Sequence, residues 1–129
     1  MGKLIVTEFV TLDGVAQGPG QSDEDREEGF VHGGWQAPLA ADDTGDDVNF
    51  EQAKHMDALL LGRKTYEIFA AFWPTAPEEY PFTGLLNRVP KYVASHTLAE
   101  PLAWKGSKLL DGDLVASVTD LKARNNEVH

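Results

Sequence analysis

The feature that most constrains the fold is an apolar run that passes through one glycine directly into a basic, helix-forming segment. Residues 58–61 read Ala-Leu-Leu-Leu, Gly62 follows, and Arg63 and Lys64 come next. Such continuous apolar character is typical of a strand that is buried on both faces, as in a parallel sheet. A strand that leads at once into a helix therefore predicts an α/β fold in which this strand is central.

The same junction is a candidate phosphate-binding turn. A glycine lets a ligand approach the backbone, and the free amides and positive dipole end of a helix start attract an anion. Arg63 and Lys64 add two cations where a helix start usually favours acidic residues, so they predict a bound anion. The alternative is a surface turn whose side chains simply face water, because the segment lacks the spacing of a Walker loop.

Length and charge limit the class of protein. The 129 residues suit one domain with a real core, so we expect a single domain over residues 1–129. There are 11 basic and 21 acidic residues, and the net charge of −10 disfavours nucleic acid and anionic membranes as partners. Cysteine is absent, and no signal peptide or apolar span of membrane length is visible. We expect a cytoplasmic protein that can still bind one anionic cofactor.

Other elements are predicted from hydrophobic periodicity and from breaker residues. We expect strands at residues 3–10, 58–61, 91–95 and near 108–110, and helices at residues 48–56, 65–72 and 114–124. Asp46 or Asp47 would cap the first helix, and Leu114, Val118 and Leu121 would form the buried stripe of the last. Residues 77–90 should be irregular apart from a short helical piece near residues 85–86. The alternation of strands and helices predicts parallel neighbours in the sheet.

Two glycine-rich loops are candidates for ligand binding. Residues 11–20 contain the pair Asp13 and Gly14, and residues 32–35 read His-Gly-Gly-Trp. Long loops in compact domains are usually binding elements, so we expect the first loop to face a ligand. Asp13 could hydrogen-bond to a substrate or protonate it, although an Asp-Gly pair is more often simply a turn. Trp35 could stack on a substrate ring, although a buried aromatic anchor is the commoner outcome.

The remaining acidic and histidine residues do not indicate a particular functional site. The acidic run at residues 22–28 is most often a solvated face. The histidines at 32, 55, 96 and 129 lack the spacing of a metal site, so no metal is expected.

The order of these motifs resembles the dihydrofolate-reductase-like family, which includes the C-terminal reductase domain of riboflavin biosynthesis. The residues that carry the resemblance are 3–10 with 12–14, then 32–35, 61–67 and 92–98. They cover essentially the whole chain. The resemblance implies a three-layer α/β/α sandwich around a mostly parallel sheet.

The resemblance also implies an NADPH-dependent reductase, in which the cofactor lies across the carboxyl ends of the strands. The matching cofactor-binding residues are Gly62, Arg63, Lys64 and Thr65 at the phosphate turn and Ser95 and His96 at a second strand end. The basic pair would favour the 2′-phosphate, hence NADPH over NADH. The implied reaction is hydride transfer to a C=N or C=O bond of a small heterocyclic or sugar-derived substrate, of pyrimidine or pterin type. Asp13 is the catalytic candidate, and Gly14, Val15 and Trp35 are the substrate-binding candidates.

The chain departs from the family pattern after residues 114–124. Family members normally continue into another strand, a glycine-rich turn and closing antiparallel strands, and these C-terminal strands are missing here. An incomplete sheet would leave an open edge, so we expect a homodimer or higher homo-oligomer with contributions from Leu109, Leu110, Val115 and Val118. Three readings stay open: a reductase, a non-catalytic protein that binds a dinucleotide or another phosphate ligand, and an interaction subunit.

Overall fold

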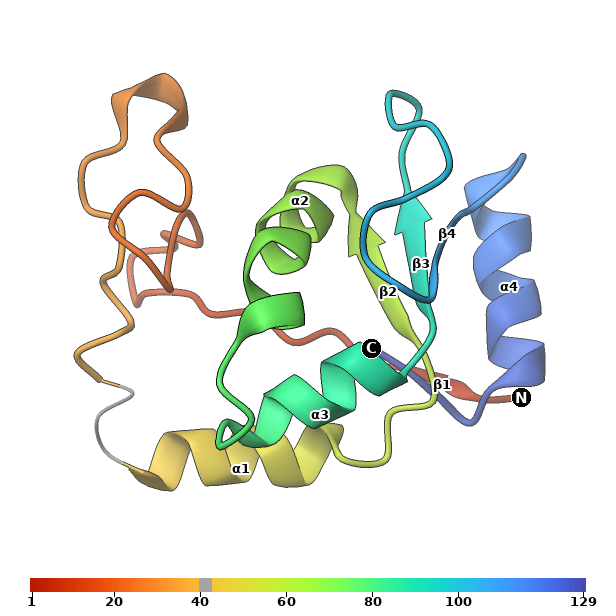
Figure 1. Cartoon of the computed structure of the whole chain (residues 1–129), viewed down its shortest axis with the longest axis horizontal. Coiled ribbons are helices and arrows are strands. Elements are labelled where there is room, and N and C mark those ends of the chain that lie inside the picture. The colour runs from red at the N-terminus through yellow and green to blue at the C-terminus, as the bar shows by residue number, and fades with distance from the viewer. Residues whose placement is uncertain (40–42) are drawn as a thin grey trace. The chain divides into compact units, whose positions relative to one another are not determined.

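A computed structural model describes residues 1–39 and 43–129 of the chain, which divide into two compact units. One unit comprises Met1–Ile5 and Ala53–His129, and the other comprises Val6–Gln52. The first unit contains the strands β1 (Lys3–Leu4), β2 (Leu59–Gly62), β3 (Lys91–Ala94), β4 (Ser107–Leu109) and β5 (Glu127–Val128) and the helices α2 (Arg63–Phe72), η2 (Trp73–Thr75), α3 (Pro81–Arg88) and α4 (Leu114–Arg124) (Figure 1). The short helix η1 (Glu27–Gly29) and nearly all of α1 (Asp43–Ala53) belong to the second unit.

The strands of the first unit run parallel. β2, β3 and β4 pair in that order, and β1 pairs with β5. A parallel bridge between Ala58 and Val128 connects the two sets, and the Leu60 amide donates a hydrogen bond of 2.6 Å to the His129 carbonyl beside it. β2 therefore has a strand on each side, which confirms the prediction that the apolar run is a central strand.

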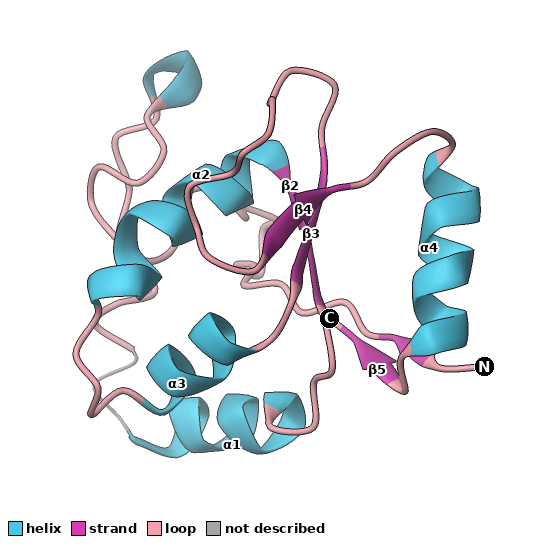
Figure 2. Cartoon of the chain, turned by 45° about the vertical axis from the view of Figure 1, so that its right-hand side comes forward, coloured by secondary structure: helices cyan, strands magenta, loops and turns pink. Residues whose placement is uncertain are grey.

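Helices cover both sides of this sheet. α2 and α3 lie on one side of the strands and α4 lies on the other (Figure 2). Ala58, Leu121 and Val128 are completely buried between α4 and the strands, and Leu60 and Tyr92 pack against them. The result is the predicted α/β arrangement, with a parallel sheet between helices.

Several predicted bounds are confirmed. α4 has the predicted bounds, and β3 and β4 lie within one residue of theirs. The Asp113 carboxylate caps α4 by accepting a hydrogen bond of 2.9 Å from the Ala116 amide. The predicted buried stripe of α4 is only partly correct, because Leu121 is buried but Leu114, in the first turn, is 52% exposed.

The predicted first strand is wrong in length. Only Lys3–Leu4 is a strand, and its ladder with β5 ends where the Ile5 amide donates to the Val128 carbonyl. Val6 is 85% exposed and Val10 is 57% exposed. The β-branched sequence favours an extended chain, but a strand also needs a partner, and in the described residues β5 offers this segment a partner of only two residues.

Two helices also differ from the prediction. α1 begins at Asp43, so Asp46 and Asp47 lie inside the helix and neither is its cap. Periodicity marks the apolar face of a helix, and the polar first turns of α1 have no such face to detect. α3 is longer than the short helical piece that was predicted, because Pro81 occupies the first position, where a missing amide hydrogen costs nothing.

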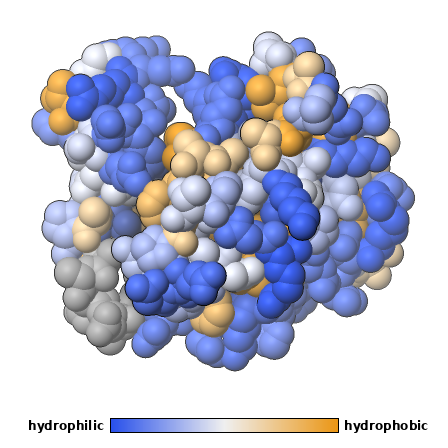
Figure 3. Space-filling model, viewed as in Figure 1, coloured by the Kyte–Doolittle hydropathy of each residue, from blue (hydrophilic) through white to orange (hydrophobic). Residues whose placement is uncertain are grey.

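The face of the molecule shown in Figure 3 is mostly hydrophilic, with scattered apolar residues. In residues 1–39 and 43–129, no helix has both the length and the apolar character needed to cross a bilayer.

Candidate functional site at the sheet edge

The predicted cofactor-binding segments meet at one edge of the sheet. Gly62, the last residue of β2, lies opposite Ala94, the last residue of β3, and Ser95 and His96 follow directly. Because β2 and β3 are parallel, their carboxyl ends share this edge, which is where open α/β sheets bind ligands. The structure therefore brings residues 62–65 and residues 95–96 together as the sequence predicted.

Gly62 is not required by the chain's own geometry. Its φ of −76° and ψ of 167° are open to any residue, and a Cβ atom built on it would meet nothing within 4 Å. A sharp turn of the chain is therefore not the reason for a glycine here. The empty space in front of Gly62 leaves the backbone open to a close ligand, which is the role predicted for this glycine.

The start of α2 differs from the start of α4. Gly62 is the N-cap of α2 and makes no side-chain capping hydrogen bond, whereas Asp113 places a carboxylate on the first turn of α4. The first turn of α2 carries no acidic residue. An anion at this end of α2 would therefore meet a positive helix end that has no carboxylate cap.

Arg63 already has an anionic partner within the chain. Its Nη1 atom lies 3.0 Å from Oε2 of Glu67, one turn later on α2. The reasoning that the basic pair needs an anion from outside is therefore wrong for Arg63, since the spacing of four residues supplies a carboxylate. Both side chains stay accessible, with 41% of Arg63 and 48% of Glu67 exposed. Lys64 and Thr65 are exposed as well.

Ser95 shapes the loop that follows β3. Its Oγ atom accepts hydrogen bonds of 3.1 Å from the amides of Thr97 and Leu98. The neighbouring His96 is exposed. The serine hydroxyl thus fixes the turn at the end of β3 and leaves the histidine accessible at the same edge.

A buried aromatic residue ties the other end of this loop to α2. Trp104 is 3% exposed, and its amide donates a hydrogen bond of 3.0 Å to the hydroxyl of Tyr66. Tyr66 lies on α2 and is itself buried. One hydrogen bond in the interior thereby connects α2 to the segment between β3 and β4.

Sequence reasoning missed the buried lysine at the start of β3. Lys91 is completely buried, and its Nζ atom donates to the carbonyls of Leu86 at 3.0 Å and Asn87 at 3.2 Å, at the end of α3. Nζ also lies 4.3 Å from the ring centroid of Trp104. Burial lowers the pKa of Lys91 to about 8. A lysine that follows a proline at the start of a strand is expected at the surface, so no feature of the sequence predicted the burial of Lys91.

The candidate catalytic residue belongs to the other unit. The Thr11 hydroxyl donates a hydrogen bond of 2.6 Å to the Asp13 carboxylate, and the Gly14 amide donates one of 3.0 Å to the Thr11 carbonyl. Gly14 has a φ of 90°, so the tight turn at this pair is confirmed. The Val15 amide completes it by donating to Thr11 Oγ1 at 2.8 Å. The Thr11 hydroxyl lowers the pKa of Asp13, so this exposed group is a hydrogen-bond acceptor and a poor proton donor.

The His-Gly-Gly-Trp element has a structural explanation. A Cβ atom on Gly33 would lie 2.6 Å from the Ser22 carbonyl oxygen, so this glycine allows two backbone segments to touch. Trp35 is half-buried, and its Nε1 atom donates a hydrogen bond of 2.9 Å to the Gln17 carbonyl. These contacts agree with the alternative in which Trp35 is an aromatic anchor of its loop.

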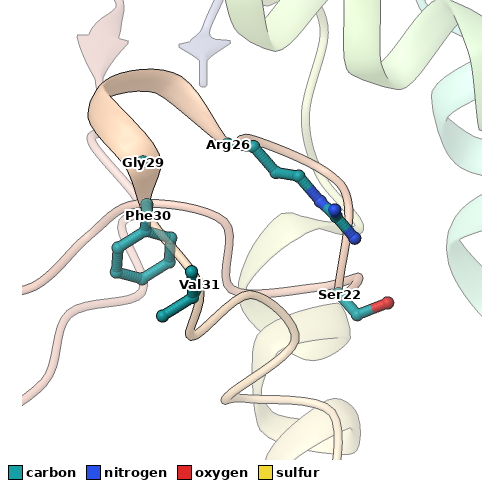
Figure 4. A pocket seen from close by; sticks show the side chains of 5 residues that line it. All are labelled: Ser22, Arg26, Gly29, Phe30 and Val31. Carbon is teal, nitrogen blue, oxygen red and sulfur yellow. The ribbon is translucent and has the colours of Figure 1, made fainter.

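The same unit holds a small cavity of about 240 Å³. Arg26 and Ser22 lie on one side of it and Phe30 and Val31 on the other (Figure 4). None of the sequence-predicted site residues lines this cavity. In the part of the chain that the structure describes, no group of three or more His, Asp or Glu side chains is placed to hold a metal ion.

Comparison with known proteins adds one match. A family model described as the RibD C-terminal domain matches residues 2–128, which is nearly the whole chain. A search of curated proteins found no match.

Proposed function

The chain belongs to the family of RibD C-terminal domains, a reductase-like family, and on this premise we propose that it is an NADPH-dependent reductase. The observation that carries the proposal is the shared edge at which the strand ends Gly62 and Ala94 lie opposite each other. In open parallel sheets this edge is where nucleotide cofactors bind.

The residues at the edge fit the phosphate groups of a dinucleotide. The space in front of Gly62 would admit a phosphate, and the first turn of α2 would donate amide hydrogen bonds to it. Arg63 and Lys64 would supply positive charge, and Thr65 a hydroxyl group, while Ser95 and His96 would flank the cofactor at the neighbouring strand end. When bound, the nicotinamide supplies the hydride.

For the substrate, we propose a small heterocycle or a sugar-derived compound with a reducible C=N or C=O bond. Asp13, whose pKa is lowered by the Thr11 hydroxyl, would orient such a substrate by accepting a hydrogen bond from an N–H or O–H group. Gly14, Val15 and Trp35 would contact it. The proton that completes the reduction would come from another donor, such as water.

The geometry of the edge also favours a second candidate function. The open space at Gly62 and the uncapped first turn of α2 fit a phosphate group whether or not a hydride is transferred. On this alternative the chain binds a dinucleotide or another phosphate ligand without turnover.

One titration followed by one assay separates these functions. NADPH fluorescence is titrated with the protein, and oxidation of NADPH is then followed with carbonyl and imine acceptors. Binding with oxidation supports the reductase, and binding without oxidation supports the non-catalytic binder. Absence of binding contradicts both and favours an interaction protein.

We also propose that the chain acts in the cytoplasm as a homodimer or higher homo-oligomer, without nucleic acid or membrane partners. The net charge of −10 supports the exclusion of polyanionic partners. Apolar surface in the first turn of α4 supports self-association, since the adjacent Leu114 and Val115 are 52% and 73% exposed.

A further inference from the structure

The ion pair between Arg63 and Glu67 bears on which nucleotide the chain prefers. Resting on the proposed function, we propose that Glu67 is a specificity-determining residue. It weakens binding of nucleotides that carry a phosphate on the adenosine ribose relative to those that lack it. The pair joins Nη1 and Oε2 at 3.0 Å, and Glu67 is the one acidic residue of α2.

The position of the pair provides the mechanism. Arg63 is the first residue of α2, directly after the open space at Gly62, and Glu67 lies one turn later on the same face. A phosphate that binds Arg63 must either displace the Glu67 carboxylate or share the guanidinium with it. In both cases the negative charge of Glu67 opposes the phosphate.

The opposition grows with the charge of the ligand. A phosphate monoester such as the 2′-phosphate carries about −1.5 to −2 charges at pH 7, whereas a ribose 2′-hydroxyl carries none. The diphosphate bridge is common to NADPH and NADH, so its interaction with Glu67 cancels in the comparison. Removing the charge of Glu67 should therefore strengthen the binding of NADPH more than the binding of NADH.

The expected effect is modest because both side chains are partly exposed. Exposed ion pairs at this spacing are weak, and repulsion between like charges is screened by salt. We therefore expect Glu67→Gln to raise the affinity for NADPH about two- to fivefold and the affinity for NADH less than about twofold. The gain should shrink at high salt. It should be smaller when Arg63 is already alanine, because Glu67 then has no guanidinium to occupy and only its screened repulsion of the phosphate remains.

The experiment measures dissociation constants for NADPH and NADH by fluorescence titration at low and high salt. The variants are Glu67→Gln, Arg63→Ala, their double mutant, and Asp120→Asn. The last breaks a matched ion pair on α4, where Arg124 Nη2 lies 2.7 Å from Asp120 Oδ2, and should leave the ratio of the two constants unchanged.

The outcomes separate the inference from the proposed function. A rise in the preference for NADPH in Glu67→Gln alone supports the inference. If the wild-type protein binds NADPH but Glu67→Gln leaves the ratio unchanged or lowers it, the inference is overturned and the proposed function stands. If the wild-type protein binds neither nucleotide, both are overturned.

Discussion

Raising the pH from 7 to about 10 should stabilise this protein through the single side chain of Lys91. Burial lowers the pKa of Lys91 from its ordinary 10.5 to about 8. Between those two values the unfolded chain binds a proton that the folded chain has released, so the free energy of unfolding rises with pH. The destabilising effect of the buried charge is fully present below pH 8 and is removed as the pH approaches 10.5.

The size of the effect follows from the width of this pH window. One group contributes at most about 1.4 kcal/mol per pH unit, so the whole window between about 8 and 10.5 corresponds to no more than about 3.4 kcal/mol. That would be a large part of the usual free energy of unfolding of a domain, about 5–15 kcal/mol. Other lysines and tyrosines also titrate in this range, so the contribution of Lys91 must be isolated by comparison with a variant.

Lys91→Met is the informative variant because it keeps an unbranched side chain and removes the charge. The variant loses the hydrogen bonds to the Leu86 and Asn87 carbonyls, which destabilises it by about 1 kcal/mol for each bond. It is also freed from the unfavourable burial of an ammonium group, which offsets this loss. We expect it to be close to the wild type in stability at pH 7 and less stable than the wild type at pH 10. Lys108→Met, at an exposed position of β4, is the matched control and should follow the wild type at every pH.

Urea unfolding followed by tryptophan fluorescence at pH 7, 8, 9 and 10 measures these free energies. The decisive quantity is the difference between the wild type and Lys91→Met as a function of pH. A difference that does not change with pH, or that moves in favour of the variant as the pH rises, would refute the reasoning.

Four further predictions follow from the site and the surface. Arg63→Ala should weaken NADPH binding about ten- to a hundredfold, or about 1.5–3 kcal/mol, and affect NADH less; equal losses in a titration would show that Arg63 does not contact the 2′-phosphate. Gly14→Val should lower the free energy of unfolding by about 1–3 kcal/mol because valine is strained at a φ of 90°, and an unchanged melting temperature would contradict the turn geometry. Gly62→Ala should change stability by less than about 0.5 kcal/mol, because its backbone and the space around it accept a side chain, yet weaken NADPH binding; undiminished binding would argue against a phosphate at Gly62. Sedimentation at micromolar concentration should show a dimer or larger species, and a well-folded monomer would contradict the proposed self-association.

Much of the fold could be read from the sequence because its signals are local. The apolar run before Gly62 indicates a buried strand, the apolar period over residues 114–124 indicates α4, and the Asp13-Gly14 pair marks a tight turn. Each depends on residues within one or two turns of the chain. The shared sheet edge was also predictable, since parallel strands place their carboxyl ends side by side. The ion pair of Arg63 with Glu67 was equally readable from its spacing of four residues, but it was missed.

By itself, then, the sequence determined the α/β class, the order of most elements and the edge at which residues 62–65 and 95–96 meet. Only the tertiary structure decided the short length of β1, which depends on how many residues of a distant strand are available for pairing. It also decided the burial of Lys91, whose ammonium group is tolerated in the interior because the end of α3 supplies two carbonyls and Trp104 an aromatic ring. Both features depend on contacts that only the packing of the folded chain creates. The local sequence pattern does not identify the residues that make these contacts.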